Sequence, residues 1–262
     1  MNKLVQYFKN LSGGVCVAFS GGVDSAVVLS AALQAGCRVH AVTLHSPLHS
    51  PADPDGAKAL AQELGATHAV LTIDEIPAPI LDNPVNRCYL CKKELFSSLW
   101  DYTRKQGLAH LVDGTNADDH KVYRPGLRAL KELGVKSPLA ELGYSKEQVR
   151  ALAREFGLTV AEKPSAPCLA TRFPYGTRLS EELMAKADRI ETFLREKGHR
   201  VVRARIHSDT VRVEVPVDDF EKLLQVREEL ISLCHEQGFV YVTMDLEGFR
   251  SGSMDVGLKL DQ

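Results

Sequence analysis

Close to its N-terminus the chain carries the segment Phe19-Ser20-Gly21-Gly22-Val23-Asp24-Ser25. The apolar residues 15–19 that lead into it predict a buried strand, and residues 26–33 after it predict a helix. The two glycines allow the backbone to approach an anion closely. Free N–H groups at a helix start attract that anion. The serine hydroxyl groups and the Asp24 carboxylate can bind phosphate or Mg²⁺, or cap the helix. The segment therefore predicts a phosphate-binding loop.

The same segment lacks the two commonest nucleotide-binding motifs. It contains neither Gly-x-x-x-x-Gly-Lys-Ser/Thr nor Gly-x-Gly-x-x-Gly, so neither a Walker A loop nor a dinucleotide-binding loop is indicated. Residues Ser20 to Ser25 instead resemble the pyrophosphate loop (PP-loop) of the N-type ATP pyrophosphatases. The resemblance implies that ATP and Mg²⁺ bind there and that ATP is cleaved to AMP and pyrophosphate while a carbonyl oxygen is adenylated. The alternative is an ordinary Gly-Gly turn with a Ser or Asp cap, which the flanking strand and helix disfavour.

The composition narrows the class of protein. The chain has 262 residues, of which 44% are hydrophobic and 25% charged, as in globular proteins. Its formal net charge of −2 gives no global basic field for a long nucleic acid, so a nucleic-acid partner is not expected. No apolar run approaches the roughly 18 residues of a membrane span, and the N-terminus has no signal-peptide core. We expect a cytoplasmic protein, in which cysteines more often serve metals or catalysis than disulfides.

Strands and helices alternate along the first two thirds of the chain. Four apolar runs predict strands at 15–19, 39–44, 66–73 and 110–113. This alternation indicates an α/β domain with a parallel sheet and helices on both faces. Ligands bind such sheets at the carboxyl ends of the strands. Three segments that follow strands are therefore expected to converge on one site: Ser20-Gly21-Gly22, Leu44-His45-Ser46 and Gly114-Thr115-Asn116.

After residue 172 the pattern changes. A helix is predicted at 180–197, and further elements follow as two strands, a helix and a strand: 201–206, 211–215, 218–235 and 240–244. The order is that of a small α+β domain. We therefore expect two domains, a PP-loop domain over residues 1–172 and a smaller domain over 173–262 that serves substrate binding or oligomerisation.

The six cysteines fall into two groups. Three of them lie in apolar or amphipathic elements and are expected to be small buried hydrophobes: Cys16, Cys37 and Cys234. Cys88 and Cys91 instead lie at a predicted helix start, in the segment Arg87-Cys88-Tyr89-Leu90-Cys91-Lys92-Lys93. Residues i and i+3 share one helix face, and the basic neighbours and the helix N-terminus favour thiolate. Cys168 lies between prolines and small residues on an extended segment.

Two thiolates from a helix and a third from a loop, Cys88, Cys91 and Cys168, suggest a metal centre. Three thiolates can hold a [4Fe–4S] cluster and leave one iron without a protein ligand. A zinc site is an alternative, because His45, His49 or His120 could supply the fourth ligand that structural zinc usually needs. A redox Cys-x-x-Cys pair and unrelated cysteines are further alternatives.

Taken together, these residues resemble the LarE family of ATP-dependent sulfur transferases, which belongs to the PP-loop superfamily and serves synthesis of a nickel-pincer nucleotide cofactor. The resemblance covers nearly the whole chain. Its most specific segments are Phe19 to Ser25, Arg87 to Lys92, Asp113 to Asp119, Tyr123 to Gly126, Ser137 to Leu139, Lys163 to Arg172 and Gly248 to Gly252. It implies that the carboxylates of pyridinium-3,5-biscarboxylic acid mononucleotide are adenylated and converted to thiocarboxylates.

Members of this family divide by sulfur source. Some carry one cysteine, at the position of Cys168, which gives up its own sulfur. Others carry three cysteines and resemble cluster-dependent transferases that use an external sulfide donor. The trio of cysteines makes this chain similar to the second kind. The resemblance also suggests a homo-oligomer such as a hexamer.

The resemblance further suggests roles for single residues. Asp24 would contact Mg²⁺ within the loop Ser20 to Ser25, and Asp24, Ser25 and Cys168 are the expected catalytic residues. Backbone atoms near Phe19 and Leu44 would bind adenine, and Thr115 would reach phosphate. Three arginines would hold the phosphate and carboxylates of the substrate: Arg172, Arg203 and Arg205.

Alternatives remain for some of these residues and for the reaction. Arg203 and Arg205 could simply form a solvated strand face, and Glu191 is interpreted as an ordinary surface acid rather than a metal ligand. A tRNA thiolase is the first rival enzyme, but such enzymes resemble Ser-Gly-Gly-Lys-Asp-Ser, whereas position 23 is valine here. An amide-forming synthetase would not need three thiolates, and an iron–sulfur or zinc carrier without catalytic activity would not need the ATP loop.

Overall fold

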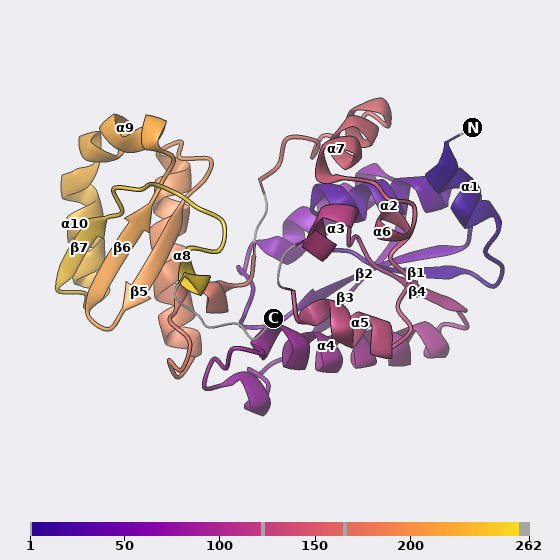
Figure 1. Cartoon of the computed structure of the whole chain (residues 1–262), viewed down its shortest axis with the longest axis horizontal. Coiled ribbons are helices and arrows are strands. Elements are labelled where there is room, and N and C mark those ends of the chain that lie inside the picture. Colours follow the sequence, from indigo (N-terminus) through magenta and orange to yellow (C-terminus); the bar gives the residue numbers. More distant parts are fainter. Residues whose placement is uncertain (1, 122–123, 165–166, 257–262) are drawn as a thin grey trace. The chain divides into compact units, whose positions relative to one another are not determined.

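A computed structural model describes residues 2–121, 124–164 and 167–256 of the chain (Figure 1). It forms two units, residues 1–80 with 85–166 and residues 81–84 with 167–262. Each unit is described by itself below. The functional division into domains 1–172 and 173–262 stays a prediction.

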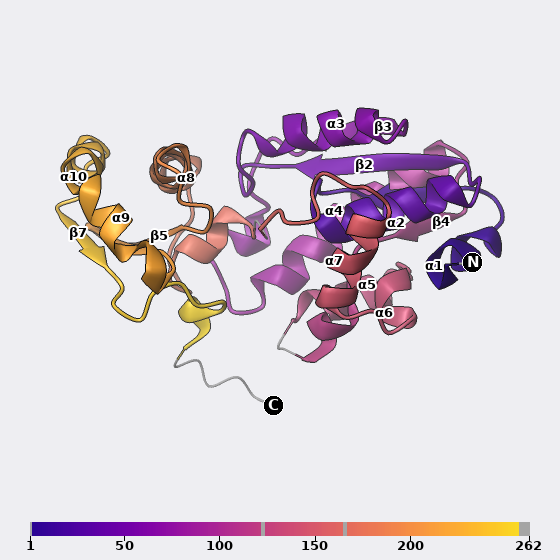
Figure 2. The same ribbon diagram turned by 90° about the horizontal axis from the view of Figure 1, so that it is seen from above.

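A parallel four-stranded sheet is the centre of the first unit. Its strands lie in the order β3-β2-β1-β4. They are β1 (Val15–Ala18), β2 (Val39–His45), β3 (Thr67–Thr72) and β4 (His110–Val112). Val15 of β1 pairs with Val39 on one side and with His110 on the other. The edge strand β3 lies beside β2, with α3 (Asp53–Glu63) alongside it (Figure 2). The prediction of a parallel α/β domain is confirmed.

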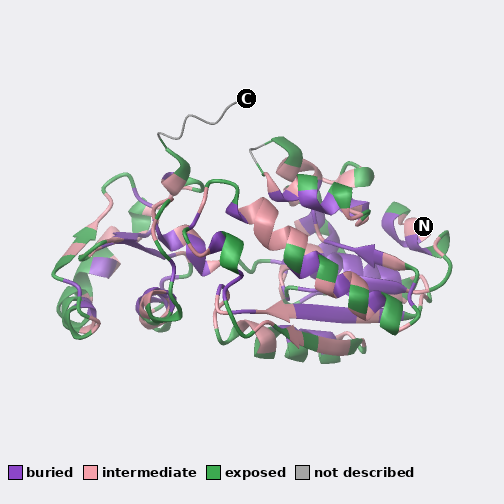
Figure 3. Ribbon diagram, turned by 90° about the horizontal axis from the view of Figure 1, so that it is seen from below, coloured by how far each residue is buried: buried purple, intermediate pink, exposed green. Residues whose placement is uncertain are grey.

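Helices cover both faces of this sheet (Figure 1). The other helices of the unit are α1 (Lys3–Lys9), α2 (Val23–Gln34), α4 (Arg87–Lys105), α5 (Gly126–Glu132), α6 (Pro138–Glu141) and α7 (Lys146–Glu155), with short 3₁₀ turns η1 (Ala78–Ile80) and η2 (Ala117–Lys121). One apolar cluster joins β1 to α1, α2, α3 and α7, and a second joins the strands to α4 and α5. The central strands are consequently buried between two helical layers (Figure 3).

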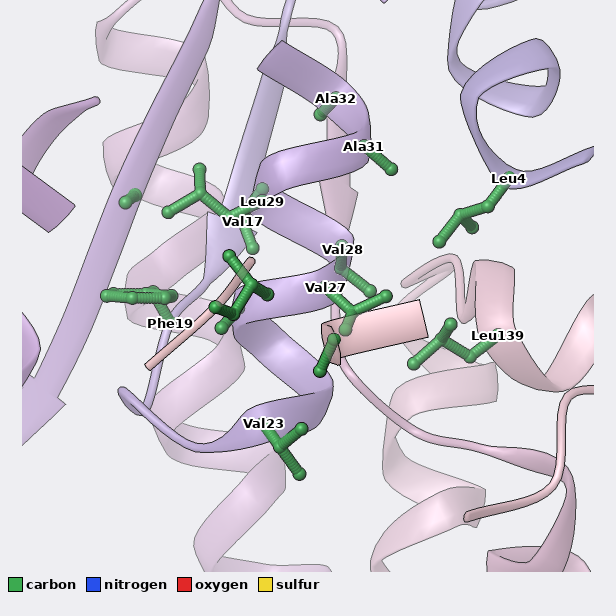
Figure 4. Packing of buried hydrophobic residues seen from close by; sticks show 14 of the residues in the cluster. Leu4, Val17, Phe19, Val23, Val27, Val28, Leu29, Ala31, Ala32 and Leu139 are labelled. Carbon is green, nitrogen blue, oxygen red and sulfur yellow. The ribbon is translucent and has the colours of Figure 1, made fainter. Parts of the chain in front are cut away.

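The helix α2 is the most buried helix of this unit. All residues from Ala26 to Ala32 are buried, and they pack among side chains that include Leu4, Val17 and Leu139 (Figure 4). A helix that is apolar on all sides has no solvent-facing stripe and belongs in a core. The core thus fixes the direction in which the N-terminus of α2 points.

The second unit contains a three-stranded sheet in the order β5-β6-β7. Its elements are η3 (Leu169–Arg172), α8 (Glu181–Glu196), β5 (Arg203–His207), β6 (Thr210–Glu214), η4 (Val217–Asp219), α9 (Phe220–Gln225), α10 (Arg227–Glu236), β7 (Tyr241–Met244) and η5 (Ser253–Asp255). β5 and β6 are antiparallel, whereas β6 and β7 are parallel. The predicted small α+β arrangement is confirmed.

One predicted element of this unit is wrong in detail. Residues 218–235 were expected to form one helix, but the structure has η4, α9 and α10 there. The backbone at Val226 (φ −106°, ψ 13°) leaves the α-helical region and separates α9 from α10. Among the helices that the structure describes, none is long and apolar enough to cross a membrane.

Candidate functional site

The predicted phosphate loop lies between β1 and α2. Gly22 is the N-cap of α2, has an extended backbone and offers no side-chain cap. The two serines brace the turn, because the Ser25 hydroxyl donates to the Gly22 carbonyl at 3.1 Å and accepts the Ser20 backbone N–H at 3.3 Å. First-turn N–H groups without a side-chain cap are groups that an anion can satisfy. The loop therefore fits a phosphate group.

Glycine is required at position 21 of this loop. Its φ is +67°, a left-handed conformation, and a Cβ placed there would lie 3.0 Å from Ala57 Cα of α3. The loop is thus pressed against α3 as well as the start of α2. The segment after β4 approaches α2 just as closely, since a Cβ at Gly114 would lie 2.8 Å from the Ser25 backbone nitrogen.

The carboxylate of Asp24 is held by two side chains from distant parts of the first unit. Asn116 donates its amide N–H to Asp24 Oδ1 at 3.1 Å, and Lys146, the first residue of α7, forms an ion pair with Asp24. A second ammonium group lies beside the loop, since Lys163 donates to the Gly21 carbonyl at 3.1 Å. Two cations next to a phosphate-sized turn favour an anionic ligand.

Sequence reasoning missed the contributions of Asn116, Lys146 and Lys163. Asn116 belongs to a segment that was predicted to lie at the end of a strand near the loop, so its closeness to Asp24 could have been expected. The two lysines lie more than 120 residues along the chain from the loop, and only the packing of α7 and the segment after it reveals them.

Two further predicted site residues, Thr115 and Phe19, already form hydrogen bonds within the first unit. The Thr115 hydroxyl donates to Asp113 Oδ2 at 2.5 Å, and Ser137 donates to Oδ1 of the same carboxylate at 2.7 Å. Phe19 packs its ring in the core, while its carbonyl accepts the Thr43 hydroxyl at 2.7 Å. Leu44 follows Thr43 at the carboxyl end of β2 and is half-buried. The segments predicted to converge therefore do lie at the carboxyl edge of the sheet, whereas the roles of Phe19, Leu44 and Thr115 stay predictions.

The cysteines of the predicted metal centre are all half-buried and free of disulfides. Cys88 and Cys91 lie in the first turns of α4 in the first unit, and Cys168 is the N-cap of η3 in the second unit. Within residues 2–121, 124–164 and 167–256, no three His, Cys, Asp or Glu side chains come together as a metal site. The predicted cluster and the alternative zinc site with His45, His49 or His120 both stay predictions.

The other three cysteines behave largely as expected. Cys16 and Cys234 are fully buried, and burial raises their pKa values to about 11 and about 12. Cys37 is only partly buried, with its thiol donating to the Phe8 carbonyl at 3.4 Å. Burial also raises the pKa of the Cys37 thiol. A raised pKa disfavours the thiolate, so these three cysteines are poorly suited to act as nucleophiles or metal ligands.

A cluster of side chains fastens the cysteine-bearing start of α4 to α5. Glu132 of α5 accepts the Tyr89 hydroxyl at 2.8 Å and Arg128 Nε at 2.9 Å, and it also pairs with Lys93. The Arg128 guanidinium lies 4.5 Å from the centre of the Tyr89 ring. Hydrogen bonds from Lys93, Arg128 and Tyr89 lower the pKa of Glu132 to about 2. Tyr89 stands between Cys88 and Cys91 in the sequence, so this cluster fixes the turn that carries both thiols.

In the second unit, Glu191 is buried and paired, which corrects its interpretation as a surface acid. It is 0% exposed and binds Arg172 through two hydrogen bonds of 2.7 and 2.8 Å. Arg195 and the Ala204 backbone N–H complete its partners at 2.7 and 3.0 Å. Ala204 lies on the edge strand β5, so Glu191 also satisfies an open strand edge. Burial opposes ionisation, but the hydrogen bonds and charge of Arg172 outweigh it and lower the pKa of Glu191.

Arg203 and Arg205 are also buried, so the alternative of a solvated strand face is wrong. They are 6% and 4% exposed. Arg205 donates to Glu214 at 2.8 and 3.0 Å and to the Thr171 carbonyl at 2.8 Å. Arg203 donates to the Val202 carbonyl at 2.6 Å and lies over the Phe249 ring at 5.2 Å. Burial, with the nearby charge of Arg172, lowers the pKa of Arg203 to about 10.

Arginine side chains and carboxylates form a buried network in this unit. Arg172 and Arg195 pair with Glu191, and Arg205 and Arg212 pair with Glu214. Guanidinium groups that are held in place in this way can donate to an anionic ligand. The predicted role of Arg172, Arg203 and Arg205 in substrate binding is compatible with this arrangement and stays a prediction.

Three residues of the segments that carry the resemblance to the LarE family lie outside the described residues: Tyr123, Ser165 and Ala166.

One family model matches more than half of the chain. It is the model of the thiamine biosynthesis protein (ThiI) family, and it matches residues 10–190.

Several relatives extend over nearly the whole chain, whereas others match only part of it. The pyridinium-3,5-bisthiocarboxylic acid mononucleotide synthase of Lactiplantibacillus plantarum is 40% identical over 96% of this chain and 92% of its own length. An uncharacterized protein of Synechocystis sp. is 39% identical over 97% and 96%. The tRNA-specific 2-thiouridylase MnmA of Trichlorobacter lovleyi is 34% identical, but over only 57% of this chain and 51% of its own. The chain therefore belongs to the LarE family of the PP-loop superfamily.

Proposed function

We propose that this enzyme, an ATP-dependent sulfurtransferase, adenylates the carboxylates of pyridinium-3,5-biscarboxylic acid mononucleotide and converts them to thiocarboxylates. The observation that carries the proposal is the 40% identity, over nearly the full length of both chains, to a synthase of the corresponding bisthiocarboxylic acid. The identity to a tRNA thiolase covers little more than half of this chain, which favours the small-molecule substrate.

Activation of the carboxylate is assigned to the loop of residues 20–25. A carboxylate is a poor acyl donor because its leaving group would be oxide. Attack of a carboxylate oxygen on the α-phosphorus of ATP gives an acyl adenylate and releases pyrophosphate, so that AMP becomes the leaving group. The N–H groups at the start of α2 and the ammonium groups of Lys146 and Lys163 would stabilise the departing pyrophosphate.

Asp24 is the residue that would hold Mg²⁺ in this site. Its carboxylate is partly exposed and is oriented by Asn116, and carboxylate oxygens are the ligands that Mg²⁺ prefers. Metal binding would displace Lys146 from Asp24 and free that ammonium group for the phosphates. Ser25 would keep the loop in its bonded shape through its contacts with Ser20 and Gly22.

Transfer of sulfur is assigned to Cys88, Cys91 and Cys168. Their thiolates match the donor set of a [4Fe–4S] cluster, and none of them is consumed in a disulfide. When bound, the cluster would supply an iron with an open coordination position for sulfide from an external donor. Attack of hydrosulfide on the acyl carbon breaks the bond to AMP and leaves the thiocarboxylate, AMP and a proton. A sacrificial Cys168 that donates its own sulfur is the second candidate route.

The arginines of the second unit are assigned to the substrate. The guanidinium groups of Arg172, Arg203 and Arg205 lie close together in this unit and suit a mononucleotide that carries a phosphate and two carboxylates. We also propose that the enzyme works in the cytoplasm as a homo-oligomer.

The test is the reaction itself, followed under anaerobic conditions. Purified enzyme is given ATP, Mg²⁺, sulfide and the pyridinium dicarboxylate mononucleotide, and pyrophosphate and product mass are measured. We expect one pyrophosphate for each oxygen replaced by sulfur. Pyrophosphate release that needs tRNA instead of the mononucleotide would contradict the proposal. A loss of sulfur mass from Cys168 after one turnover would favour the sacrificial route over the external donor.

A further inference from the structure

The helix α7 carries three basic side chains that are spaced four residues apart, Lys146, Arg150 and Arg154. Residues i and i+4 lie on the same face of a helix, so the three form a basic stripe. The helix itself is fixed to α2, because its buried residues belong to the apolar cluster that contains α2: Val149, Leu152 and Ala153. The stripe therefore has a set position relative to the helix whose N-terminus forms the phosphate loop.

Arg150 of this stripe holds the backbone of the segment that follows α7. Its Nη1 donates to the Ala161 carbonyl, and its Nη2 donates to the Lys163 carbonyl at 3.2 Å. Residues 159–163 form neither helix nor strand, so no regular hydrogen-bond ladder fixes these carbonyl groups. A guanidinium group is planar and presents its donors in a rigid fork. Arg150 thus fastens the segment to α7 at two points.

Lys163 reaches the phosphate loop from this segment. Its ammonium group donates to the Gly21 carbonyl at 3.1 Å, while the residue as a whole is exposed. A lysine side chain is a flexible stem of four carbons. The place of its ammonium group therefore depends on where its backbone is held, and Arg150 binds the carbonyl of that same residue.

Arg154, one turn further along the stripe, touches the same segment in a different way. It pairs with the Glu162 carboxylate at 2.7 Å, and the two side chains are 55% and 66% exposed. An exposed ion pair contributes little to stability, and this one binds a side chain instead of the backbone. Arg150 and Arg154 consequently share their charge and helix face but differ in what they hold.

We propose that Arg150 is a positioning residue, which places the ammonium group of Lys163 at the phosphate loop by holding the backbone of residues 161–163 against α7. The proposal rests on the proposed function, in which the loop of residues 20–25 receives the pyrophosphate part of ATP. Lys163 would exchange the Gly21 carbonyl for a phosphate oxygen, and the segment would not have to be ordered at that moment. Because Lys146 pairs with Asp24 from the same helix, α7 sets the place of both ammonium groups.

The experiment is a calorimetric titration of the full chain with inorganic pyrophosphate in the presence of Mg²⁺. Loss of a hydrogen bond to a charged group should raise the dissociation constant about tenfold in Lys163→Gln, and about as much in Arg150→Gln. The double variant should bind within about twofold of Lys163→Gln, because a residue that acts through Lys163 adds nothing once Lys163 is gone.

Two further variants separate the fork of Arg150 from its charge. Arg154→Gln removes the same charge from the same face of α7 and should leave binding unchanged. Arg150→Lys keeps the charge but loses the planar fork, so it should weaken binding as Arg150→Gln does. Urea unfolding of every variant checks that the fold is kept, and Arg150→Lys replaces Arg150→Gln in the double variant if the latter does not fold.

Several outcomes would overturn the positioning role. They are a parent enzyme that binds no pyrophosphate, an Arg150→Gln enzyme that binds it as tightly as the parent, and an equal loss in Arg154→Gln. Losses that multiply in the double variant would also overturn it, because Arg150 would then act independently of Lys163. The proposed function is tested separately by product mass. An enzyme that binds pyrophosphate as expected but forms no thiocarboxylate from the mononucleotide would contradict that function and leave the role of Arg150 in place.

Discussion

In the proposed function, the two units would bind anions by different physical means. In the first unit, the loop before α2 offers backbone N–H groups and the glycine-permitted close approach at Gly21, with few charges of its own. In the second unit, guanidinium groups are kept in place by buried carboxylates such as Glu191 and Glu214. The backbone groups of the loop come from neighbouring residues in the sequence. Leaving them without a ligand lowers the stability of the fold only slightly. The arginine site must be assembled from strands and helices, and its carboxylates keep the cations ordered before a ligand arrives.

The strongest test of this contrast concerns the carboxylate of the loop. Asp24→Asn keeps the shape of the side chain but removes its charge, so both the proposed Mg²⁺ ligand and the charged partner of Lys146 are lost. We expect pyrophosphate release to fall by about 100-fold or more. Asp101→Asn, at an exposed ion pair on α4, is the control and should keep full activity. An Asp24→Asn enzyme as fast as the parent would contradict the role of the loop.

The second test addresses the buried carboxylate that orders the arginines. Glu191 is fully buried, so Glu191→Gln leaves the buried guanidinium of Arg172 without its counter-charge. We expect the free energy of unfolding to fall by about 3–5 kcal/mol at pH 7, measured in urea. Glu196→Gln on the exposed end of the same helix should change it by less than about 0.5 kcal/mol.

The pH dependence of Glu191 sharpens this test. Its pKa is lowered in the folded protein, because the hydrogen bonds and charge of Arg172 outweigh the effect of burial. Its contribution to stability is therefore complete above the ordinary carboxyl pKa and disappears as the pH falls through the lowered value. The stability difference between the parent and Glu191→Gln should shrink below about pH 4.5. A difference that grows in acid would show that the pair does not stabilise the ionised form.

The smallest effect is expected at the cluster that joins α4 to α5. Glu132 is held ionised down to about pH 2 by Lys93, Arg128 and Tyr89. Its contribution is complete above the ordinary carboxyl pKa and is lost progressively as the pH falls from there to about 2. Glu132→Gln should lower stability slightly at pH 7 and not at all near pH 2, and its effect should be smaller than that of Glu191→Gln. A loss of stability in Glu132→Gln as large as that in Glu191→Gln would contradict the interpretation of this cluster as a set of exposed ion pairs.

Much of the first unit could be predicted from local sequence. Apolar runs broken by glycine gave the strands and helices, and Phe19 to Ser25 marked the loop, because each of these signals lies within about ten neighbouring residues. Lys146 and Lys163 could not be found in this way. Their contacts with Asp24 and Gly21 arise from the packing of α7 and the segment after it.

The second unit was harder to predict for the same reason. Glu191 was interpreted as an ordinary surface acid on a helix, but its partners Arg172 and Ala204 come from η3 and β5. Hydrophobic periodicity cannot predict a buried ion pair, because it assigns a charged residue to the surface whether or not an oppositely charged partner lies beside it. The break between α9 and α10 at Val226 could not be predicted either, because no glycine or proline lies there.

In the proposed reaction, sulfur reaches the activated carboxylate through Cys88, Cys91 and Cys168. The most direct measurement is the iron and acid-labile sulfide content of anaerobically purified and reconstituted enzyme, compared with Cys88→Ala and with Cys37→Ala as the control. We expect about four iron atoms per chain, which are lost in Cys88→Ala and retained in Cys37→Ala. Absence of iron in the parent enzyme, or an equal iron content in Cys88→Ala, would contradict it.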